Sequence, residues 1–403
     1  MVYNRFMKRI KVAIIGGGAS GLVLASSLQC NNENTVALFE RGERLGKKLS
    51  ATGNGQGNVT HRNISVADYF SCAQPPKERL ESILTKYDDG SFCAFLQEMG
   101  LLCLTDERGR VYPSGRQASS ITDALRFTVA QNGVQIYTQT QIVGLEKAKD
   151  GFILQAENDA FHAQNVVLCT GGKAAKNFGT DGTAYALALA LGHSVTALTP
   201  SLVQLKTQTS TIKTLKGIRV ANGKLTARWR GGEHSLCGDI IFTDYGVSGD
   251  AVFRISAYVA DKTDVTLWLD FLPEYTEEQI YLALSKKRAA FPSLPFEELL
   301  GGIVNNQVGR AVLKTVKKDD IQAAAKAVKA FPLAVTGTLG FDYAQVTKGG
   351  IPLAETDDSL QSIYAKGLYF AGEILDVDGA CGGYNLQWAY ASARVVADAL
   401  NAK

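Results

Sequence analysis

The opening strand and the glycine turn that follows it constrain the fold of this chain more than any other feature. Lys11–Ile15 is a short, apolar, partly β-branched run that stops at Gly16, as a buried parallel strand does. Small and aliphatic residues over Ala19–Leu28 favour a helix packed closely on that strand. Val36–Phe39 is the next apolar run, and it ends at the acidic residue Glu40. These segments predict a βαβ unit that begins a doubly wound α/β sheet.

The turn satisfies the pattern G-x-G-x-x-G between strand and helix. The first glycine permits a sharp turn, the second lets the backbone approach a diphosphate, and the third allows close packing of the helix. The amides and dipole of the helix start face the phosphate charge. Glu40 follows 19 residues after Gly21, at a strand end where it can accept hydrogen bonds from ribose hydroxyls. Glycine turns also serve purely structural connections, but this combination predicts a dinucleotide site. The residues expected at the diphosphate are Gly16, Gly18, Ala19, Ser20 and Gly21.

Residues 41–64 form a polar stretch without a sustained apolar period. A long polar loop directly after a strand is usually functional or disordered. An NAD domain needs nothing special after the acidic residue, whereas a flavin enzyme must route its chain along a longer cofactor. We therefore favour an FAD-binding loop, in which glycines permit close approach and polar side chains supply hydrogen bonds. Its expected binding residues are Arg41, Lys47, Lys48, Thr52, Gly53, Asn54 and Asn58.

A second segment near the C-terminus also distinguishes FAD from NAD. Gly367–Ala371 has the pattern of a buried strand, and the acidic stretch Gly372–Gly379 follows it. A carboxylate at such a strand end can hold ribityl hydroxyls. Gly382–Gln387 then opens the last helix, whose dipole can face the flavin N1/O2 edge, where reduction accumulates negative charge. Turn and helix-capping roles are the alternative for these residues. The residues expected to bind here and at the nearby strand ends are Ile142, Thr170, Gly171, Gly372, Glu373, Asp376, Asn385 and Leu386.

The residue pattern and composition change twice in the middle of the sequence. Between about 195 and 270, apolar and polar residues alternate and the sequence is rich in Thr and Val, which predicts an inserted antiparallel β-domain. Residues 276–330 are rich in Ala, Lys and Leu, as helices are. The sheet domain is thus expected to be interrupted and then completed at the C-terminus. The expected divisions are an FAD-binding domain over 1–192 and 345–403, a β-rich domain over 193–271 and 331–344, and a helical domain over 272–330.

Composition narrows the classes of partner. The 403 residues include 42 basic and 39 acidic ones, spread along the chain, which gives no electrostatic reason to expect nucleic acid or an anionic membrane. Seven scattered cysteines without a CxxC pair predict reduced thiols, and four isolated histidines predict no metal site. The polar stretch Met1–Arg9 lacks the apolar core of a signal peptide, and no apolar run approaches the roughly 20 residues of a membrane span. We expect a cytoplasmic protein with a small-molecule substrate, and its oligomeric state stays open.

Three segments, KKLSATGNGQGN, GGIPLAE and GLYFAGEILDVDGACGGYNLQWAYASA, resemble the flavoprotein family that includes BaiN-type reductases and aminoacetone oxidase. The similarity runs through nearly the whole chain. It implies a Rossmann-like, GR2-like FAD-binding domain with inserted β-barrel-like and small helical domains, and a small organic substrate. The chain also departs from the family. Gln56-Gly57 stand where the family commonly carries Arg-Cys, Asp244 where it often has His, and Asp250 where it often has Pro.

The reaction class follows from what the cofactor supplies and what the chain lacks. The loop from Arg41 to Asn58 contains no cysteine, which argues against a flavin disulfide reductase. No second G-x-G-x-x-G follows a predicted strand, so NAD(P)H is expected only as a transient electron donor. The leading hypothesis is an FAD-dependent oxidoreductase that moves a hydride to or from a small carbonyl, enone or amine. A flavin-binding sensor without turnover and an NAD-binding dehydrogenase are the alternatives. No residue is assigned a catalytic role, and the candidate substrate-side groups are Tyr112, Arg116, Asp244 and Tyr384.

Overall fold

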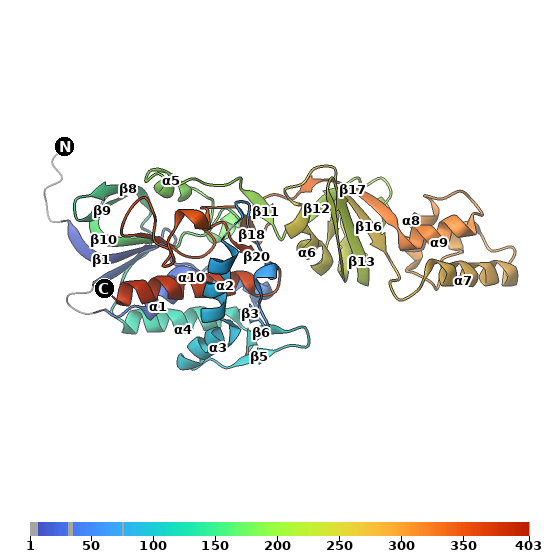
Figure 1. Ribbon diagram of the computed structural model, residues 1–403. Coiled ribbons are helices and arrows are strands. Elements are labelled where there is room, and N and C mark those ends of the chain that lie inside the picture. The colour runs from blue at the N-terminus through green and yellow to red at the C-terminus, as the bar shows by residue number, and fades with distance from the viewer. Residues whose placement is uncertain (1–6, 31–34, 75, 403) are drawn as a thin grey trace. The chain divides into compact units, whose positions relative to one another are not determined.

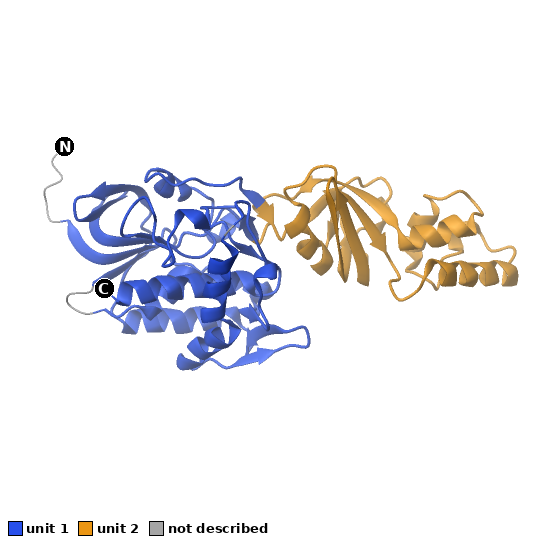
Figure 2. Cartoon of the chain, in the orientation of Figure 1, with its two compact units in different colours: residues 1–199, 346–403 blue, residues 200–345 orange. Residues whose placement is uncertain are grey.

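The computed structural model describes residues 7–30, 35–74 and 76–402, and it divides into two compact units (Figures 1 and 2). The first unit comprises Met1–Thr199 and Val346–Lys403, and the second comprises Pro200–Gln345. The first boundary lies seven residues beyond the expected one at 192, and the return lies one residue beyond 345. The expected β-rich and helical domains fall together in the second unit.

A seven-stranded sheet forms the centre of the first unit, in the order β7-β2-β1-β10-β9-β8, with β19 also beside β10. Five of its strands are parallel, and β8 and β9 complete it as an antiparallel extension. This is the doubly wound sheet that the opening βαβ unit predicts. Its strands are β1 (Lys8–Ile15), β2 (Val36–Phe39), β7 (Gln135–Tyr137), β8 (Ile142–Ala148), β9 (Gly151–Ala156), β10 (Ala160–Leu168) and β19 (Leu368–Phe370).

The register brings the carboxyl ends of four strands to one edge of the sheet. Ile15 pairs with Phe39 and Leu168, and Leu168 pairs with Phe370. In open α/β sheets, ligands bind beyond the carboxyl ends of the strands. The segments predicted to bind the cofactor therefore converge there, beginning at Gly16, Glu40, Thr170 and Gly372.

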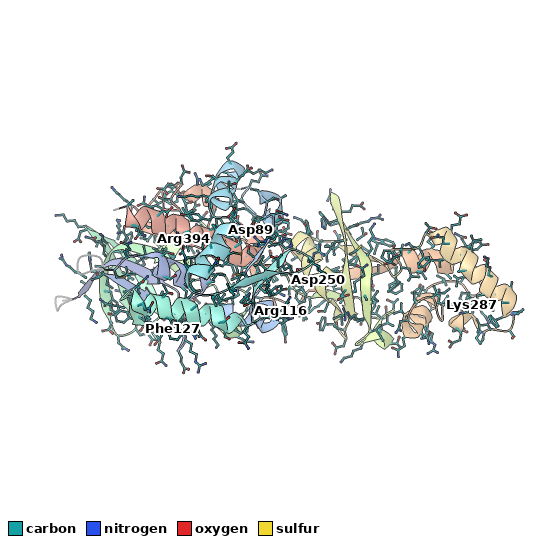
Figure 3. All side chains as sticks on the ribbon, turned by 90° about the horizontal axis from the view of Figure 1, so that it is seen from below. Asp89, Arg116, Phe127, Asp250, Lys287 and Arg394 are labelled. Atoms are coloured by element: carbon teal, nitrogen blue, oxygen red, sulfur yellow. The ribbon has the colours of Figure 1, made fainter. Side chains whose placement is uncertain are left out.

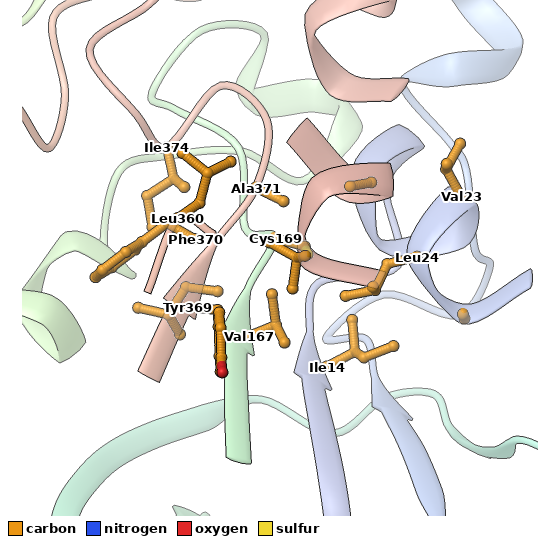
Figure 4. Close-up of a cluster of buried hydrophobic side chains, with 14 of the residues drawn as sticks. Ile14, Val23, Leu24, Val167, Cys169, Leu360, Tyr369, Phe370, Ala371 and Ile374 are labelled. Carbon is orange, nitrogen blue, oxygen red and sulfur yellow. The ribbon is translucent and has the colours of Figure 1, made fainter. Parts of the chain in front are cut away.

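Helices α1 (Ala19–Ser27), α4 (Ala118–Gln131) and α10 (Tyr384–Asn401) belong to the same unit, and α1 contacts both of the others. Ile14, Leu24 and Val167 are fully buried where α1 meets β1 and β10, and Tyr369 and Phe370 of β19 continue this core (Figure 4). The core thereby fixes the strand ends that carry the candidate site.

Residues 77–98 form two helices, α2 (Lys77–Lys86) and α3 (Asp89–Glu98). Asp88 starts the second helix, because its carboxylate accepts a hydrogen bond from the Ser91 amide at 2.7 Å. The remaining elements of this unit are short. They are β3 (Thr60–His61), β4 (Tyr69–Phe70), β5 (Cys103–Thr105), β6 (Arg110–Pro113), α5 (Tyr185–Leu189), β18 (Val346–Lys348) and β20 (Asp378–Gly379).

The second unit is a closed barrel with helices (Figure 1). Buried residues of the barrel strands and of α7, α8 and α9 form one hydrophobic cluster, so the helical segment shares a core with the barrel. Its strands follow the order β12 (Leu205–Thr207), β15 (Gly246–Ser248), β14 (Gly232–Phe242), β13 (Arg219–Trp229), β16 (Thr266–Asp270) and β17 (Phe331–Thr338), and β11 (Thr199–Ser201) precedes them. Its helices are α6 (Asp250–Val259), α7 (Glu277–Ala290), α8 (Asn306–Leu313) and α9 (Ile321–Lys329).

Over the described part of the chain, none of the helices combines the length and the apolar character that crossing a bilayer requires.

Candidate functional site

The three glycines of the turn have different surroundings. A Cβ at Gly16, whose φ is +106°, would lie 2.5 Å from the Cys169 carbonyl oxygen, and a Cβ at Gly21 would lie 1.9 Å from the Gly16 carbonyl oxygen. A Cβ at Gly18 would meet nothing within 4 Å. The first and third glycines therefore allow close packing, whereas the second faces open space. This is the division of roles that a diphosphate-binding turn requires.

Helix α1 begins beside that open space. Its N-cap residue is Gly18, so no side chain caps the first amides, and its first turn contains no acidic residue. The positive end of the helix is therefore available to an anion. Ala19 is the first helical residue. The hydroxyl of Ser20 donates to the Ala371 carbonyl at 3.2 Å, which ties the helix start to the end of β19.

A cavity of about 180 Å³ opens at the carboxyl ends of the strands. Five residues predicted from the sequence line it: Gly16, Glu40, Arg41, Ile142 and Thr170. The sequence-based prediction missed the rest of its wall, which includes Thr140, Thr180, Asp181 and Thr183. No motif marks these residues, because the loop over 179–184 reaches the cavity only through the fold.

Glu40 and Arg41 are held in place at the rim of this cavity. The Glu40 carboxylate accepts hydrogen bonds from the Gly17 amide at 2.9 Å and the Gly42 amide at 2.7 Å. Arg41 forms an ion pair with Asp181 at 2.9 Å. Burial opposes ionisation of Asp181, but hydrogen bonds from Arg41 and Thr183 outweigh it and lower the pKa of its carboxyl to about 2. Arg41 thus ties the strand end to the loop over 179–184 at neutral pH.

The cavity residues fit the adenosine end of FAD. The Thr170 hydroxyl is buried and has no hydrogen-bond partner among the described residues. Buried polar groups are normally satisfied, so an orphan in a cavity wall indicates a missing partner. Glu40 has two oxygens whose remaining lone pairs can accept ribose hydroxyls. Together with the open space before Gly18, these groups match an adenosine diphosphate.

Lys48 and Glu373 join the two segments that distinguish FAD from NAD. Their charged groups lie 2.8 Å apart, although the residues are far apart in sequence. Glu373 also accepts the Thr347 amide at 2.9 Å, and the Thr347 hydroxyl accepts the amides of Lys173 and Ala174. The polar loop, the end of β10 and the C-terminal segment therefore meet at one point. Gly171, with φ +68°, makes the bend that brings this part of the chain there.

Asp376, Asn385 and Asn58 have protein partners that the sequence did not reveal. Asp376 has no exposed surface, and its carboxylate accepts the Ser71 hydroxyl and the amides of Cys72 and Ala73 at 2.8–3.0 Å. Asn385 exchanges two hydrogen bonds of 2.8 Å with the Gly379 backbone. Asn58 donates to the carbonyls of Thr60 and Val111, which pins β3 to β6. In the structure these side chains brace loops, and a cofactor contact for them remains a prediction.

The remaining predicted residues are distributed around the loops. Thr52 donates to the Leu49 carbonyl, and Gly53 and Asn54 adopt φ values of 58° and 54° in the 3-10 segment Leu49–Gly55. Lys47 and Asn54 are exposed, whereas Leu386 packs partly buried against the core. Gly372, with φ +81°, leaves room for the Ser20 side chain. Asp244 lies in the second unit, where it forms an exposed ion pair with Lys216 at 2.7 Å.

Like the starts of α1 and α4, the start of α10 lacks a side-chain cap. Its N-cap is Gly383, without a side-chain cap or an acidic residue in the first turn. A Cβ at Gly383 would lie 2.5 Å from the Thr60 carbonyl oxygen, so α10 packs directly on β3. The rings of His61 and Tyr384 stack there, with centroids 5.1 Å apart. This is the helix end that the sequence assigns to the flavin ring.

Position 57 differs from the family pattern for a physical reason. Gly57 has φ +75°, and a Cβ there would lie 2.9 Å from the Ala118 Cα atom. The packing of α4 therefore leaves no space for a cysteine at this position without a backbone shift. Gln56 accepts a hydrogen bond from Arg116 at 3.2 Å.

No group of three or more His, Cys, Asp or Glu residues in the described ranges is arranged to hold a metal ion.

Comparison with known proteins identifies the family. The model of the "HI0933-like protein Rossmann domain" matches residues 10–399. The chain is 35% identical to the 3-dehydro-bile acid delta(4,6)-reductase of Clostridium scindens, over 95% of this chain and 97% of that protein. It is 28% identical to a ribosomal RNA dihydrouridine synthase of Haemophilus influenzae, over 94% and 96%. The fold is similar to that of 3-ketosteroid-delta4-(5alpha)-dehydrogenase from Rhodococcus jostii, with a TM-score of 0.51 at 15% identity over 99% and 98% of the chains.

These matches confirm the resemblance drawn from the sequence and the predicted fold class. The chain belongs to the HI0933-like Rossmann family of FAD-dependent oxidoreductases.

Proposed function

We propose that this protein uses non-covalently bound FAD to reduce a carbon–carbon double bond conjugated to a carbonyl group in a small, steroid-like substrate. The observation that carries the proposal is the similarity, along almost the whole chain, to a reductase whose name places its double bonds in a 3-dehydro bile acid. A 3-oxo group conjugated with such bonds makes the far carbon electrophilic. This narrows the substrates left open by the sequence, which are a carbonyl or enone that accepts hydride and an amine that donates it, to the enone.

In this proposal, each part of FAD has its own protein partners. The uncapped start of α1 at Gly18 would hold the diphosphate, and Glu40 with the Thr170 hydroxyl would hold the adenosine end. The start of α10 at Gly383 would face the flavin ring, where its dipole stabilises the charge of the reduced form. When bound, FAD supplies the hydride chemistry, while the protein binds and orients the substrate. NAD(P)H is proposed as the transient donor that reduces the flavin.

Reduction of uridine in RNA is a second candidate, because two relatives are named ribosomal RNA dihydrouridine synthases, at 28% and 27% identity. Dihydrouridine forms when a uracil double bond conjugated to a carbonyl is saturated, so the bond chemistry is the same. RNA affinity depends on many phosphate contacts by basic residues. The near-balanced charge, +3 over 403 residues, supplies little general attraction for RNA. The small substrate is therefore favoured.

Anaerobic stopped-flow measurement tests the proposal. The purified protein should be yellow and release FAD on denaturation, and NADH or NADPH should bleach the flavin. Reoxidation should then follow addition of an enone such as 4-androstene-3,17-dione, but not addition of the corresponding saturated ketone. Reoxidation by unmodified ribosomal RNA alone would move the assignment to the second candidate. Bleaching by small amines instead of nicotinamides would replace reduction with amine oxidation, and a flavin that nothing reduces would indicate a sensor.

A further inference from the structure

Tyr112 of β6 is a buried tyrosine that lies outside the residues proposed to bind FAD. Only 6% of its surface is exposed. The described residues provide no hydrogen-bond partner for its hydroxyl, and the hydroxyl is not among the polar atoms sealed from solvent. A buried phenol normally finds a partner. The Tyr112 hydroxyl therefore reaches solvent, where a ligand atom can become its partner.

The backbone places Tyr112 at the start of α10. β6 pairs with β3, which lies directly against Gly383. Arg110 and Tyr112 are two residues apart on β6 and so point to the same face of it. The Arg110 Cγ atom lies 3.9 Å from where a Cβ of Gly382 would be. Tyr112 thus shares the face of β6 that meets the glycine-rich segment assigned to the flavin ring.

Two guanidinium groups flank the Tyr112 ring. The central carbon of Arg116 lies 4.6 Å from the ring centroid and that of Arg110 lies 5.8 Å away. Arg110 is fixed by an ion pair with Asp106 at 2.7 Å. Arg116, labelled in Figure 3, adopts a left-handed φ of 47°, a conformation that is costly for a non-glycine residue and often retained at functional sites. These cations favour negative charge on the phenol oxygen when it loses its proton.

We propose that the Tyr112 hydroxyl binds the carbonyl oxygen of the conjugated substrate and donates its proton to that oxygen as the double bond is reduced. The inference rests on the proposed enone reduction and names the residue that activates the enone. Hydride adds to the β-carbon, the π electrons shift toward the carbonyl oxygen, and that oxygen takes the Tyr112 proton, which gives an enol. The enol becomes the saturated ketone in water, and water returns a proton to the phenolate. The two electrons come from the reduced FAD.

The resting state of Tyr112 suits this role. Burial raises the pKa of its hydroxyl and outweighs the lowering effect of Arg110. Asp106 raises this pKa further, Arg116 lowers it, and Cys381 raises it least. The phenol therefore stays protonated at neutral pH, ready to donate. Position 57, where the family commonly has a thiol, offers no acid in this chain.

Tyr112→Phe tests the inference, because it removes the hydroxyl and keeps the ring. We expect unchanged FAD content and unchanged flavin reduction by NAD(P)H, but reoxidation by 4-androstene-3,17-dione slowed by roughly 100-fold or more, as for loss of a general acid. Flavin absorbance titration should show about five- to tenfold weaker binding of this 3-ketone to the oxidised enzyme. Binding of the 3-deoxy analogue, androst-4-en-17-one, should not change. Tyr275→Phe, an exposed tyrosine of the second unit, is the matched control.

A second variant tests the inference independently, in case Tyr112→Phe does not fold. Arg116 is exposed, so Arg116→Gln should fold normally and slow reoxidation by roughly tenfold, with rescue by Arg116→Lys. Wild-type reoxidation rates and 3-ketone affinity in Tyr112→Phe would overturn the role of Tyr112 and leave the proposed function standing. A wild-type enzyme whose reduced flavin no enone reoxidises would overturn the proposed function, and this inference with it.

Discussion

At the residue scale, the glycines of the turn show how one residue type serves opposite purposes within six positions. A glycine is needed at position 21 because the Gly16 carbonyl oxygen leaves no room for a Cβ atom. At Gly18 the protein leaves open space, and a glycine there lets a bound diphosphate approach the backbone. The close packing at Gly21 agrees with the sequence pattern, whereas the diphosphate role of Gly18 stays a prediction. Because the surroundings of Gly18 and Gly21 differ, mutation of each glycine can test its role separately.

Gly18→Ala and Gly21→Ala should fail in different ways. At Gly21 the added Cβ would lie 1.9 Å from the Gly16 carbonyl oxygen, so we expect the free energy of unfolding to fall by at least about 2 kcal/mol. At Gly18, with φ −80° and open space, stability should hold while FAD affinity falls by roughly tenfold. Chemical denaturation and FAD titration measure the two effects. Equal loss of stability in both variants would contradict the assignment of open space to the diphosphate.

Cys93 is the residue whose reactivity should depend most clearly on pH. Its side chain hydrogen-bonds with that of Cys103, and this contact, with Arg62 nearby, lowers the pKa of the Cys93 thiol to about 7 despite partial burial. The thiolate fraction therefore rises as pH increases through 7. Burial raises the pKa of Cys169 to about 12. Iodoacetamide labelling followed by mass spectrometry should show the rate of Cys93 modification rising roughly tenfold between pH 6 and pH 8, as the thiolate fraction rises from about 9% to about 91%. Cys169 should stay unmodified.

Cys103→Ser provides the control for that experiment. The hydroxyl is a poorer match for the thiol contact, so the midpoint of Cys93 labelling should move to higher pH. A midpoint near 9 in the unmodified protein would show that the thiol pair does not form.

At the element scale, the loops that follow the strands carry the site, and their positions depend on contacts between distant segments. The sequence predicted α1, α10 and the strands β1, β2 and β19, because each has a local apolar pattern. It did not predict β8, where Glu146 and Lys147 interrupt the apolar pattern, or the division between α2 and α3. Both depend on packing and capping that local periodicity does not record.

Asp376 anchors one of these loops, and its replacement tests that role. Asp376→Ala removes three hydrogen bonds from a side chain with no exposed surface, so we expect a loss of about 2–4 kcal/mol in the free energy of unfolding. FAD affinity, measured at a temperature where the variant is folded, should stay unchanged. Asp358→Ala, which removes an exposed carboxylate that pairs with Arg79, is the control. A large drop in FAD affinity would instead support the ribityl contact predicted from the sequence.

At the scale of the whole molecule, each unit has its own hydrophobic cluster. All residues assigned to the adenosine, diphosphate and ring positions belong to the first unit. Of the residues singled out from the sequence, the second unit contains Asp244 and Asp250. The two units should therefore respond differently to the cofactor.

Thermal unfolding should show two transitions, and FAD should raise the midpoint of only one. Binding to the folded state stabilises by about 2.7 kcal/mol when the ligand concentration is 100 times Kd. Scanning calorimetry with and without added FAD measures the shift, and flavin fluorescence identifies the transition that releases it. One transition that moves as a whole would show that the units unfold together.

The sequence by itself determined the βαβ start, the polar loop, the glycine-rich start of the last helix and thereby the family, because each is a local pattern of a few adjacent residues. The tertiary structure alone decided which of these residues meet. It paired Lys48 with Glu373, gave Asp376 its partners at residues 71–73, placed the loop over 179–184 in the cavity wall and brought β6 to α10. Such contacts join segments far apart in the chain. They depend on the register and packing of the whole sheet, which no local pattern encodes.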